Sequence, residues 1–239
     1  MRAGVLVLHG FTGTPWEVEP LALALRAAGY LVECPTLPGH CTTPEELART
    51  SWRAWQGAAE AAWARLGRRT ERRAVVGFSM GGLLAIRLSA AHEDVGALVT
   101  VGTPIALPGW AARAARLLGR FGPRVALPKL RGSDIKDPAA HAASPSYDRI
   151  PASALGELLA LARAARADLR LVRAPTLVVH ATHDHTAPYA HAAQLAAGLG
   201  STDVRMLTLA ESFHLAFVDV EADRAIEGVS RFLGHRLAR

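Results

Sequence analysis

The sequence predicts an α/β fold in which a mostly parallel sheet of about six strands is covered by helices on both faces. Short apolar runs alternate along the chain with longer helical patterns, which is typical of parallel strands joined by crossover helices. Half of the 239 residues are apolar and 20% are charged, a composition that suits a large buried core. The longest uncharged run, Val95 to Ala112, is broken by prolines and glycines, so no membrane insertion is expected.

Each expected strand is a short apolar run that ends at a turn signal. The first, Val5 to Leu8, contains β-branched residues and is followed by His9 and Gly10. The remaining expected strands are Leu31 to Cys34, Ala74 to Phe78, Ala97 to Val101, Thr176 to Ala181 and Val204 to Leu209.

The expected helices lie between these strands and have recognisable ends. Pro15 suits a first helical turn, Ser51 suits an N-cap, and Gly29 and Gly67 suit positions just beyond a helix. The helices expected on this basis span residues 16–28, 52–66, 80–91, 188–199 and 221–237.

The alternation stops after the fourth strand. Residues 104–171 contain no strand-like run, but they hold two helical patterns, Trp110 to Arg120 and Ala152 to Leu171, joined by a stretch rich in Pro, Gly and Ser. We therefore expect an inserted cap over residues 104–171, and a core formed by residues 1–103 and 172–239.

The net charge of +6 does not indicate a nucleic-acid partner. All 27 basic residues except Lys129 and Lys136 are arginines, and they are dispersed along the chain. Their densest group, Arg68 to Arg73, has no aromatic side chains interleaved for base stacking. The sequence does not define an oligomeric state.

The cysteines do not define a metal site. Cys34 and Cys41 flank a Pro-rich loop, where both a disulfide and two free thiols suit a chain of this size. Neither has a Cys or His neighbour at zinc spacing, and no metal or cofactor is expected. The first residues lack the core of a signal peptide, so a cytoplasmic location is expected.

The strongest local signal is the run Gly77-Phe78-Ser79-Met80-Gly81, between an expected strand and an expected helix. A G-x-S-x-G sequence in this context predicts a tight turn that exposes the serine hydroxyl at a helix N-terminus. Because a serine hydroxyl is a weak nucleophile alone, it needs a base, and that base needs an acid to orient it.

The chain resembles the α/β-hydrolase family, and within it the small bacterial carboxylesterases and monoacylglycerol lipases. The resemblance spans nearly the whole chain and rests on His9 to Gly13, Leu37 to His40, Gly77 to Gly82, Ala174 to Val179 with Asp184, and Phe213-His214. It implies an α/β-hydrolase fold with a small helical cap. It also implies that Ser79 is the nucleophile, Asp184 the acid and His214 the base.

The order Ser, Asp, His agrees with this assignment, because each residue follows a strand and the carboxyl ends of parallel strands share one rim. The nearby acids Glu211 and Asp219 lie in the wrong loop for the family arrangement. The other candidate histidines, which we expect to lie at the surface or behind the site, are His180, His183, His185 and His191.

An oxyanion formed during acyl transfer needs preorganised N–H donors. Met80, directly after the serine, supplies one from the helix start, and the resemblance places the second on the backbone of Phe11. His9 and His40 are expected to tie loops together. Apolar residues that we expect to line the cap above the serine are Leu107, Trp110, Leu117, Leu118, Phe121 and Leu127.

These residues predict a cofactor-free serine esterase that hydrolyses carboxylic esters of short to medium acyl chains, monoacylglycerols among them, through an acyl-enzyme on Ser79. A small-molecule ester is the expected partner. Two alternatives stay open: a thioesterase or peptidase that uses the same triad, and a non-catalytic member that binds a small apolar ligand.

Overall fold

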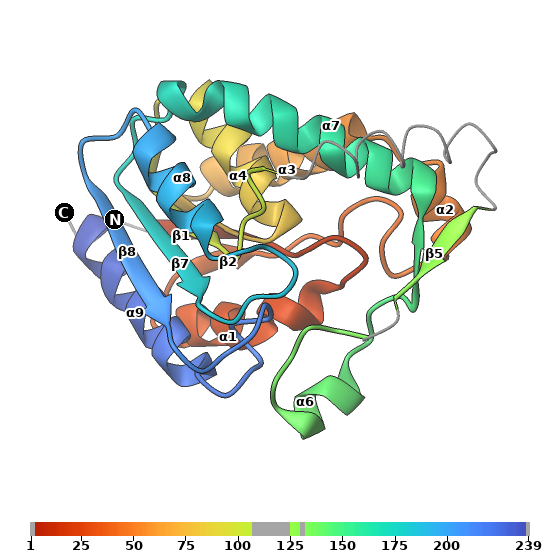
Figure 1. The fold of residues 1–239 in the computed structure, drawn as a ribbon. Coiled ribbons are helices and arrows are strands. Elements are labelled where there is room, and N and C mark those ends of the chain that lie inside the picture. Colours follow the sequence, from red (N-terminus) through yellow and green to blue (C-terminus); the bar gives the residue numbers. More distant parts are fainter. Residues whose placement is uncertain (1–2, 107–124, 130–131, 238–239) are drawn as a thin grey trace.

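The protein contains a six-stranded, fully parallel sheet with the strand order β2-β1-β3-β4-β7-β8. A computed structural model describes residues 3–106, 125–129 and 132–237 (Figure 1). The strands are β1 (Ala3–Leu8), β2 (Leu31–Glu33), β3 (Arg72–Phe78), β4 (Val95–Val101), β7 (Thr176–Ala181) and β8 (Val204–Leu209). The predicted α/β fold with about six strands is confirmed.

Helices cover both faces of the sheet, as Figure 1 shows. On one face lie α1 (Glu19–Ala27), preceded by the short 3-10 helix η1 (Pro15–Val18), and α9 (Ala222–Leu237). On the other lie α3 (Trp52–Gly67), α4 (Met80–Ala91), α7 (Ala152–Asp168) with the 3-10 turn η2 (Leu169–Leu171), and α8 (Ala190–Gly198). No helix in the described ranges is long and apolar enough to cross a membrane.

Alternate strand residues supply the two halves of the core. Leu6 and Leu8 of β1 face the side of α3 and α4, whereas Val5 and Val7 face the side of α1 and α9. This division follows from the two-residue period of a β-strand. It also explains why the strands are apolar on both faces, as covered parallel strands must be.

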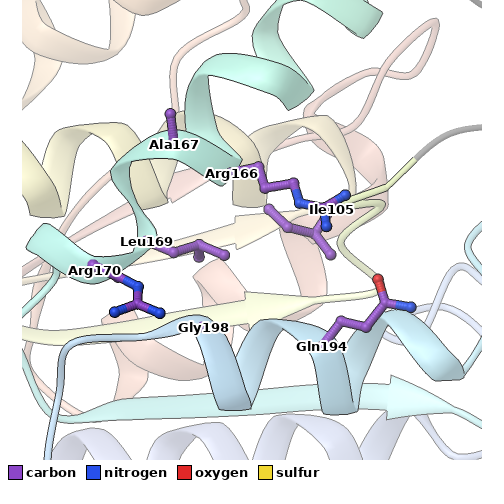
Figure 2. Close-up of a pocket in the computed structure, with 7 residues that line it drawn as sticks. All are labelled: Ile105, Arg166, Ala167, Leu169, Arg170, Gln194 and Gly198. Atoms are coloured by element: carbon purple, nitrogen blue, oxygen red, sulfur yellow. The ribbon is translucent and has the colours of Figure 1, made fainter.

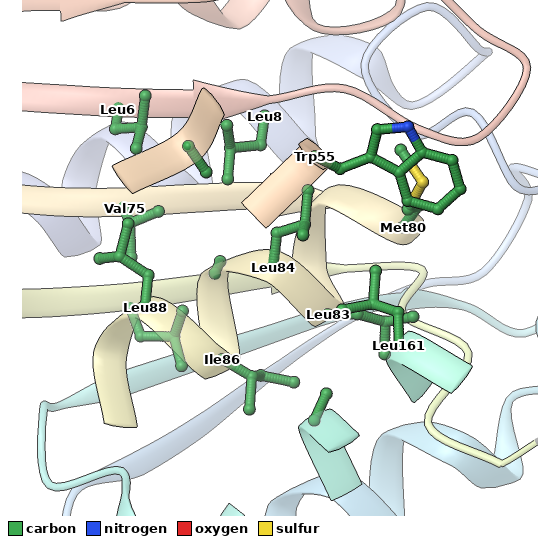
Figure 3. Packing of buried hydrophobic residues seen from close by; sticks show 14 of the residues in the cluster. Leu6, Leu8, Trp55, Val75, Met80, Leu83, Leu84, Ile86, Leu88 and Leu161 are labelled. Atoms are coloured by element: carbon green, nitrogen blue, oxygen red, sulfur yellow. The ribbon is translucent and has the colours of Figure 1, made fainter. Parts of the chain in front are cut away.

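Helix α4 lies at the centre of one core layer. Its buried side chains pack against strands β1 and β3 and helices α3 and α7, as the cluster in Figure 3 shows. Leu83, Leu84 and Leu88 are fully buried, and even Ser89 is only 5% exposed. A helix that is apolar on nearly all sides is typical of such a central position. Its N-terminus is therefore held firmly where β3 ends.

The segment between β4 and β7, which we call the insertion, contains secondary structure that the sequence prediction omitted. β5 (Ala126–Pro128) and β6 (Arg149–Pro151) form a two-stranded antiparallel pair, so the expectation of no strand in residues 104–171 is wrong. Each strand has only three residues, too few to show a two-residue period, and each ends in proline, which is rare in strands. Two short helices were also not predicted, α2 (Pro44–Ala48) in the core segment and α6 (Pro138–Ala143) in the insertion.

The two cysteines are free thiols. Cys34 lies just after β2, where burial raises the pKa of its thiol to about 11. Cys41 is exposed. The thiol of Cys34 is therefore uncharged at neutral pH and behaves as a small apolar side chain.

Replacing Leu84 by Ala is expected to lower the free energy of unfolding by about 2–5 kcal/mol, because it removes a fully buried side chain and leaves a cavity. Leu23→Ala is the matched control, since Leu23 is 55% exposed on α1 and its loss should change the free energy by no more than about 0.5 kcal/mol. Urea unfolding measures both, and equal effects would contradict the assigned core.

Candidate active site

Ser79 occupies a strained turn between β3 and α4. Its φ of 52° lies in the left-handed region, although it is not glycine. The hydrogen bond from the Ser79 N–H to the Val101 carbonyl, at 2.8 Å, holds the turn against the end of β4. The strain persists because the strand and the buried helix on either side fix the backbone, and it places the hydroxyl of Ser79 at the helix N-terminus.

The glycines of the motif are required by close backbone packing. A Cβ atom on Gly77 would lie 2.1 Å from the Gly81 carbonyl oxygen, and one on Gly81 would lie 2.3 Å from the Leu8 carbonyl oxygen. On Gly82, a Cβ would lie 1.9 Å from the hydroxyl of Thr103. Small residues around the serine thus allow α4 to begin directly against β1 and β4.

The structure brings Ser79, His214 and Asp184 into one hydrogen-bonded chain. His214 Nε2 lies 3.0 Å from Ser79 Oγ, and His214 Nδ1 lies 2.7 Å from Asp184 Oδ2. The three residues come from the loops after β3, β8 and β7, so they meet at the carboxyl edge of the sheet. All three are buried, with exposures of 7% for Ser79 and Asp184 and 5% for His214.

The ionisation states of Asp184 and His214 fix the direction of each hydrogen bond in the series. Burial opposes ionisation of Asp184, but His214, His180 and the Ala187 N–H outweigh it, so the pKa of Asp184 lies well below its ordinary value. The ionised carboxylate can only accept, so His214 Nδ1 carries the proton and donates it. In the neutral ring Nε2 then accepts from the Ser79 hydroxyl.

His214 is a stronger base than a free imidazole. Burial opposes its protonation, but the adjacent Asp184 carboxylate outweighs burial and raises the pKa of His214 above its ordinary value. The Phe78 ring, with its centroid 4.9 Å from that of His214, packs against the imidazole. His214 is therefore suited to accept a proton from Ser79 while it stays hydrogen-bonded to the Asp184 carboxylate.

Asp184 has further partners that hold it in place. Its Oδ1 accepts the N–H groups of Thr186 and Ala187, at 2.9 and 2.6 Å. His180 donates from Nε2 to the Ala187 carbonyl at 2.7 Å, and the same nitrogen lies 3.4 Å from Asp184 Oδ2. His180 therefore lies behind the carboxylate and does not approach Ser79.

The rival acids have other partners. The Asp219 carboxylate accepts N–H groups of Phe213, Lys136 and Asp137, which makes it a bridge between the His214 loop and the insertion. Glu211 pairs with Lys136 at the surface, at 2.8 Å. In the geometry described here, Asp184 is the acid that reaches His214 Nδ1.

The backbone N–H groups of Met80 and Phe11 are available as donors. Outside the hydrogen bonds within helices and strands, neither has an acceptor in the described part of the chain. Met80 begins α4, where the first N–H groups of a helix have no intrahelical partner. A backbone N–H without a protein acceptor can bind an anionic group.

His9 ties two loops together, as the sequence predicts, whereas the hydrogen bond of His40 stays within its own loop. His9 Nδ1 lies 2.9 Å from the Gly10 carbonyl oxygen, and His9 Nε2 accepts the Leu37 N–H at 3.0 Å. Burial, with a smaller contribution from His40, lowers the pKa of His9 to about 3. His9 therefore stays neutral, with Nδ1 as the donor. His40 makes a local hydrogen bond with the Pro38 carbonyl, at 3.1 Å.

A cavity of about 230 Å³ opens onto Ser79 and His214. Its lining is mainly apolar. The insertion supplies Ile150, Leu155 and Leu158, and the rest of the chain supplies Phe11, Phe78 and Leu215. Polar groups at its wall are Thr12, Glu17, Lys129, Asp134 and Thr186.

Only part of the expected cap lining can be compared with this cavity. Leu127 is 38% exposed on β5 and is not among the lining residues, so its expected role is wrong. Ile150, its partner in register on β6, supplies an apolar contact there instead. The other five residues expected to line the cap, which lie between 107 and 121, fall outside the described residues.

Asp134 joins the insertion to two loops of the site, a role that sequence reasoning missed. Its carbonyl accepts the N–H groups of His214 and Leu215, at 3.1 and 3.2 Å. Its carboxylate accepts the N–H of His185 at 2.9 Å and the hydroxyl of Thr186 at 3.2 Å. The insertion therefore fixes both the loop of His214 and the loop of Asp184.

Gly102 also shapes the site without any chemistry of its own. It has a φ of 54°, and a Cβ there would lie 3.1 Å from the His214 ring and 3.3 Å from Asp184 Oδ2. The glycine after β4 leaves room for the imidazole. Its place at the end of a strand was the available signal, but only the fold shows which ring it accommodates.

A second hollow, of about 240 Å³, lies between α7 with η2 and α8. Figure 2 shows Arg166, Arg170 and Gln194 at its wall, with Leu169 and Ile105. It contains no nucleophile with a neighbouring base. Within the described ranges, no three His, Cys, Asp or Glu side chains are placed to hold a metal ion.

Residues 1–221 match the family model described as serine aminopeptidase, S33. The chain belongs to this α/β-hydrolase family. It is 34% identical over 226 residues to a thermostable monoacylglycerol lipase of a Bacillus species, covering 94% of this chain and 87% of that protein. A carboxylesterase of Bacillus subtilis is 26% identical over 238 residues, covering 96% of this chain and 91% of the relative.

A solved structure agrees with these relatives. The protein superposes with a TM-score of 0.88, at 32% identity, on a structure from a study of LipS and LipT, two metagenome-derived lipolytic enzymes. The alignment covers 97% of this chain and 93% of that chain. This α/β-hydrolase is therefore a serine hydrolase of the lipase and carboxylesterase class.

Gly81→Ala in this hydrolase is expected to lower the free energy of unfolding by about 1–3 kcal/mol, because the added Cβ would lie 2.3 Å from a backbone oxygen. Gly57→Ala is the control, since Gly57 is exposed on α3 with nothing within 4 Å, and should stabilise by about 0.5–1 kcal/mol. Opposite signs in urea unfolding support the packing described, and two variants that are both neutral would refute it.

Proposed function

We propose that the protein is a serine esterase that hydrolyses carboxylic esters of short to medium acyl chains, monoacylglycerols among them, through an acyl-enzyme on Ser79. The observation that carries the proposal is the continuous hydrogen-bonded chain from Ser79 through His214 to Asp184. The mainly apolar cavity above Ser79 supports an acyl chain as the group bound. The lipase and the carboxylesterase among the relatives support the same choice.

In the acylation step, Ser79 Oγ attacks the ester carbonyl carbon while its proton passes to His214 Nε2. The Asp184 carboxylate stabilises the imidazolium that forms. The N–H groups of Met80 and Phe11 receive the charge that develops on the carbonyl oxygen. As the tetrahedral intermediate collapses, the bond to the alcohol breaks, and the imidazolium gives its proton to the departing alkoxide.

In the deacylation step, water replaces the alcohol. His214 Nε2 takes a proton from the water as the water attacks the acyl carbon, and the same two N–H groups stabilise the second oxyanion. Collapse releases the carboxylic acid and returns the proton to Ser79 Oγ. Ser79, His214 and Asp184 each regain their starting protonation state, so no cofactor enters the proposed cycle.

The proposal includes the division of the chain into a core, residues 1–103 and 172–239, and a cap, residues 104–171. Ile150, Leu155 and Leu158 of the proposed cap line the cavity, which supports its contact with substrate. α7 packs on α4 and thereby attaches this segment to the core. A cytoplasmic setting, a small-molecule ester as partner and the absence of a nucleic-acid partner belong to the same proposal.

Ser79→Ala should lower kcat for short p-nitrophenyl esters by at least about 10⁴-fold, because the nucleophile is lost while the fold remains. Ser89→Ala is a matched control. Like Ser79 it is buried, but it lies within α4 and away from the cavity. A fluorophosphonate probe should label the wild type and the control but not Ser79→Ala. Undiminished turnover in Ser79→Ala would refute the proposed nucleophile.

A substrate panel separates the proposed esterase from the two alternatives. Monoacylglycerols and esters of graded chain length should be hydrolysed at higher kcat/KM than matched thioesters or aminoacyl p-nitroanilides. The reverse order would replace the esterase proposal with a thioesterase or peptidase. Ligand binding without turnover or probe labelling would instead indicate a non-catalytic member.

Asp184→Asn should lower kcat by about 10⁴-fold, because the imidazole loses the acceptor that fixes its tautomer. The carboxylate raises the pKa of His214, so its removal lowers that pKa, and the acid limb of the residual kcat/KM profile should move to lower pH. Asp223→Asn, at an exposed position of α9, is the control and should leave the profile unchanged. An acid limb that stays in place or moves to higher pH would contradict the assignment.

A further inference from the structure

Glu17 is a buried carboxyl group at the wall of the active-site cavity, and the proposed mechanism does not use it. The residue is only 5% exposed and lines the same cavity as Ser79 and His214. Its Oε2 accepts the N–H of Gly10 at 3.0 Å. Gly10 directly precedes Phe11, whose own N–H is one of the two proposed oxyanion donors.

The loop between β1 and η1 is folded around this carboxyl group. A Cβ on Gly13 would lie 1.9 Å from Glu17 Oε1, and one on Gly10 would lie 3.0 Å from Oε2. η1 begins at once after the loop, with Thr14 as its N-cap and Pro15 in its first turn. The two glycines of the His9 to Gly13 motif therefore leave the space that the Glu17 side chain fills.

The two peptide groups that flank the Cα atom of Gly10 are each held by a hydrogen bond. His9 Nδ1 donates to the Gly10 carbonyl of the Gly10–Phe11 peptide at 2.9 Å, and Glu17 accepts from the Gly10 N–H of the His9–Gly10 peptide. Because a trans peptide is planar, its C=O and N–H point in opposite directions. Holding the Gly10 carbonyl on His9 therefore also sets the direction of the Phe11 N–H.

Burying this carboxyl group is costly. Burial raises the pKa of Glu17 to about 7, although the Gly10 N–H and the nearby Lys129 and His214 act against the rise. Asp134, on the insertion, is a further charged group at the same cavity. An apolar side chain would avoid the cost of burial, but it would leave the Gly10 N–H without its acceptor.

We propose that Glu17 is a positioning residue for the oxyanion hole. Its hydrogen bond to the Gly10 N–H holds the His9–Gly10 peptide and, together with the His9 bond to the Gly10 carbonyl, fixes the backbone of Gly10 so that the Phe11 N–H is directed at the developing oxyanion. The inference rests on the proposed esterase function. It assigns Glu17 no contact with the substrate and no proton transfer. The loss of its hydrogen bond should therefore raise the barrier for chemistry and leave the binding of ester nearly unchanged.

The test compares variants that keep or remove the acceptor. Glu17→Gln keeps an oxygen for the Gly10 N–H and should retain kcat within about threefold. Glu17→Met and Glu17→Leu remove the acceptor and should lower kcat by about 10- to 100-fold, less than the complete loss of one oxyanion donor, with KM within about threefold. Glu19→Met, two residues along and exposed, is the control with wild-type kinetics.

A trifluoromethyl ketone, which forms a tetrahedral adduct with a reactive serine, gives a second readout. Its affinity should fall in parallel with kcat in Glu17→Met and Glu17→Leu, but not in Glu17→Gln. Thermal melting identifies which apolar variant is folded, and either one suffices. A folded apolar variant with wild-type kcat, or with reduced kcat but unchanged affinity for the ketone, would overturn the inference.

The same experiment distinguishes this inference from the function on which it rests. If the esterase proposal fails, the wild type itself will show no turnover that depends on Ser79. If only the inference fails, the wild type will hydrolyse the ester and the apolar Glu17 variants will match it.

Discussion

The arrangement of the site depends on one buried hydrogen bond, between Asp184 and His214. At 2.7 Å, and with the Asp184 side chain fully shielded from solvent, this bond joins the charged carboxylate to the buried ring of His214. A buried charge is tolerated only when hydrogen bonds replace its lost hydration. The N–H groups of Thr186 and Ala187 supply that replacement, so the loop after β7 stabilises the carboxylate that in turn sets the tautomer and basicity of His214.

The loops of the site are held by contacts distant in sequence as well as by the strands that precede them. Thr12, at φ 60° in the loop after β1, accepts hydrogen bonds through its carbonyl from the N–H of Tyr147 and the hydroxyl of Ser146. Tyr147 also donates from its hydroxyl to the Gly39 carbonyl at 3.1 Å. With the Asp134 contacts, the insertion holds the loops after β1, β2, β7 and β8. The sheet supplies approximate positions, and these hydrogen bonds fix the final geometry.

Much of this arrangement could be predicted from the sequence, for identifiable reasons. The strands Thr176–Ala181 and Val204–Leu209 and the helix Met80–Ala91 have the predicted bounds, because each is a periodic run with a clear boundary. Ser79 was found because a tight turn demands glycines around the serine. Asp184 and His214 were assigned by the resemblance to the α/β-hydrolase family, and their places after strands that share one edge agree with it. In contrast, Glu17, Gly102 and Asp134 lie in no motif that predicts their contacts. Asp134 meets a loop 51 residues away, and only the folded chain brings the two together.

The double hydrogen bond to the Asp134 carbonyl has a consequence for protein engineering. A chimera that received the insertion of another α/β-hydrolase would lose a clamp on the backbone of His214 unless the graft supplied an equivalent carbonyl. Substrate range in this architecture therefore cannot be altered by exchanging the insertion as an independent module. The graft must be chosen for its fit to the imidazole loop as well as for the shape of the pocket that it encloses.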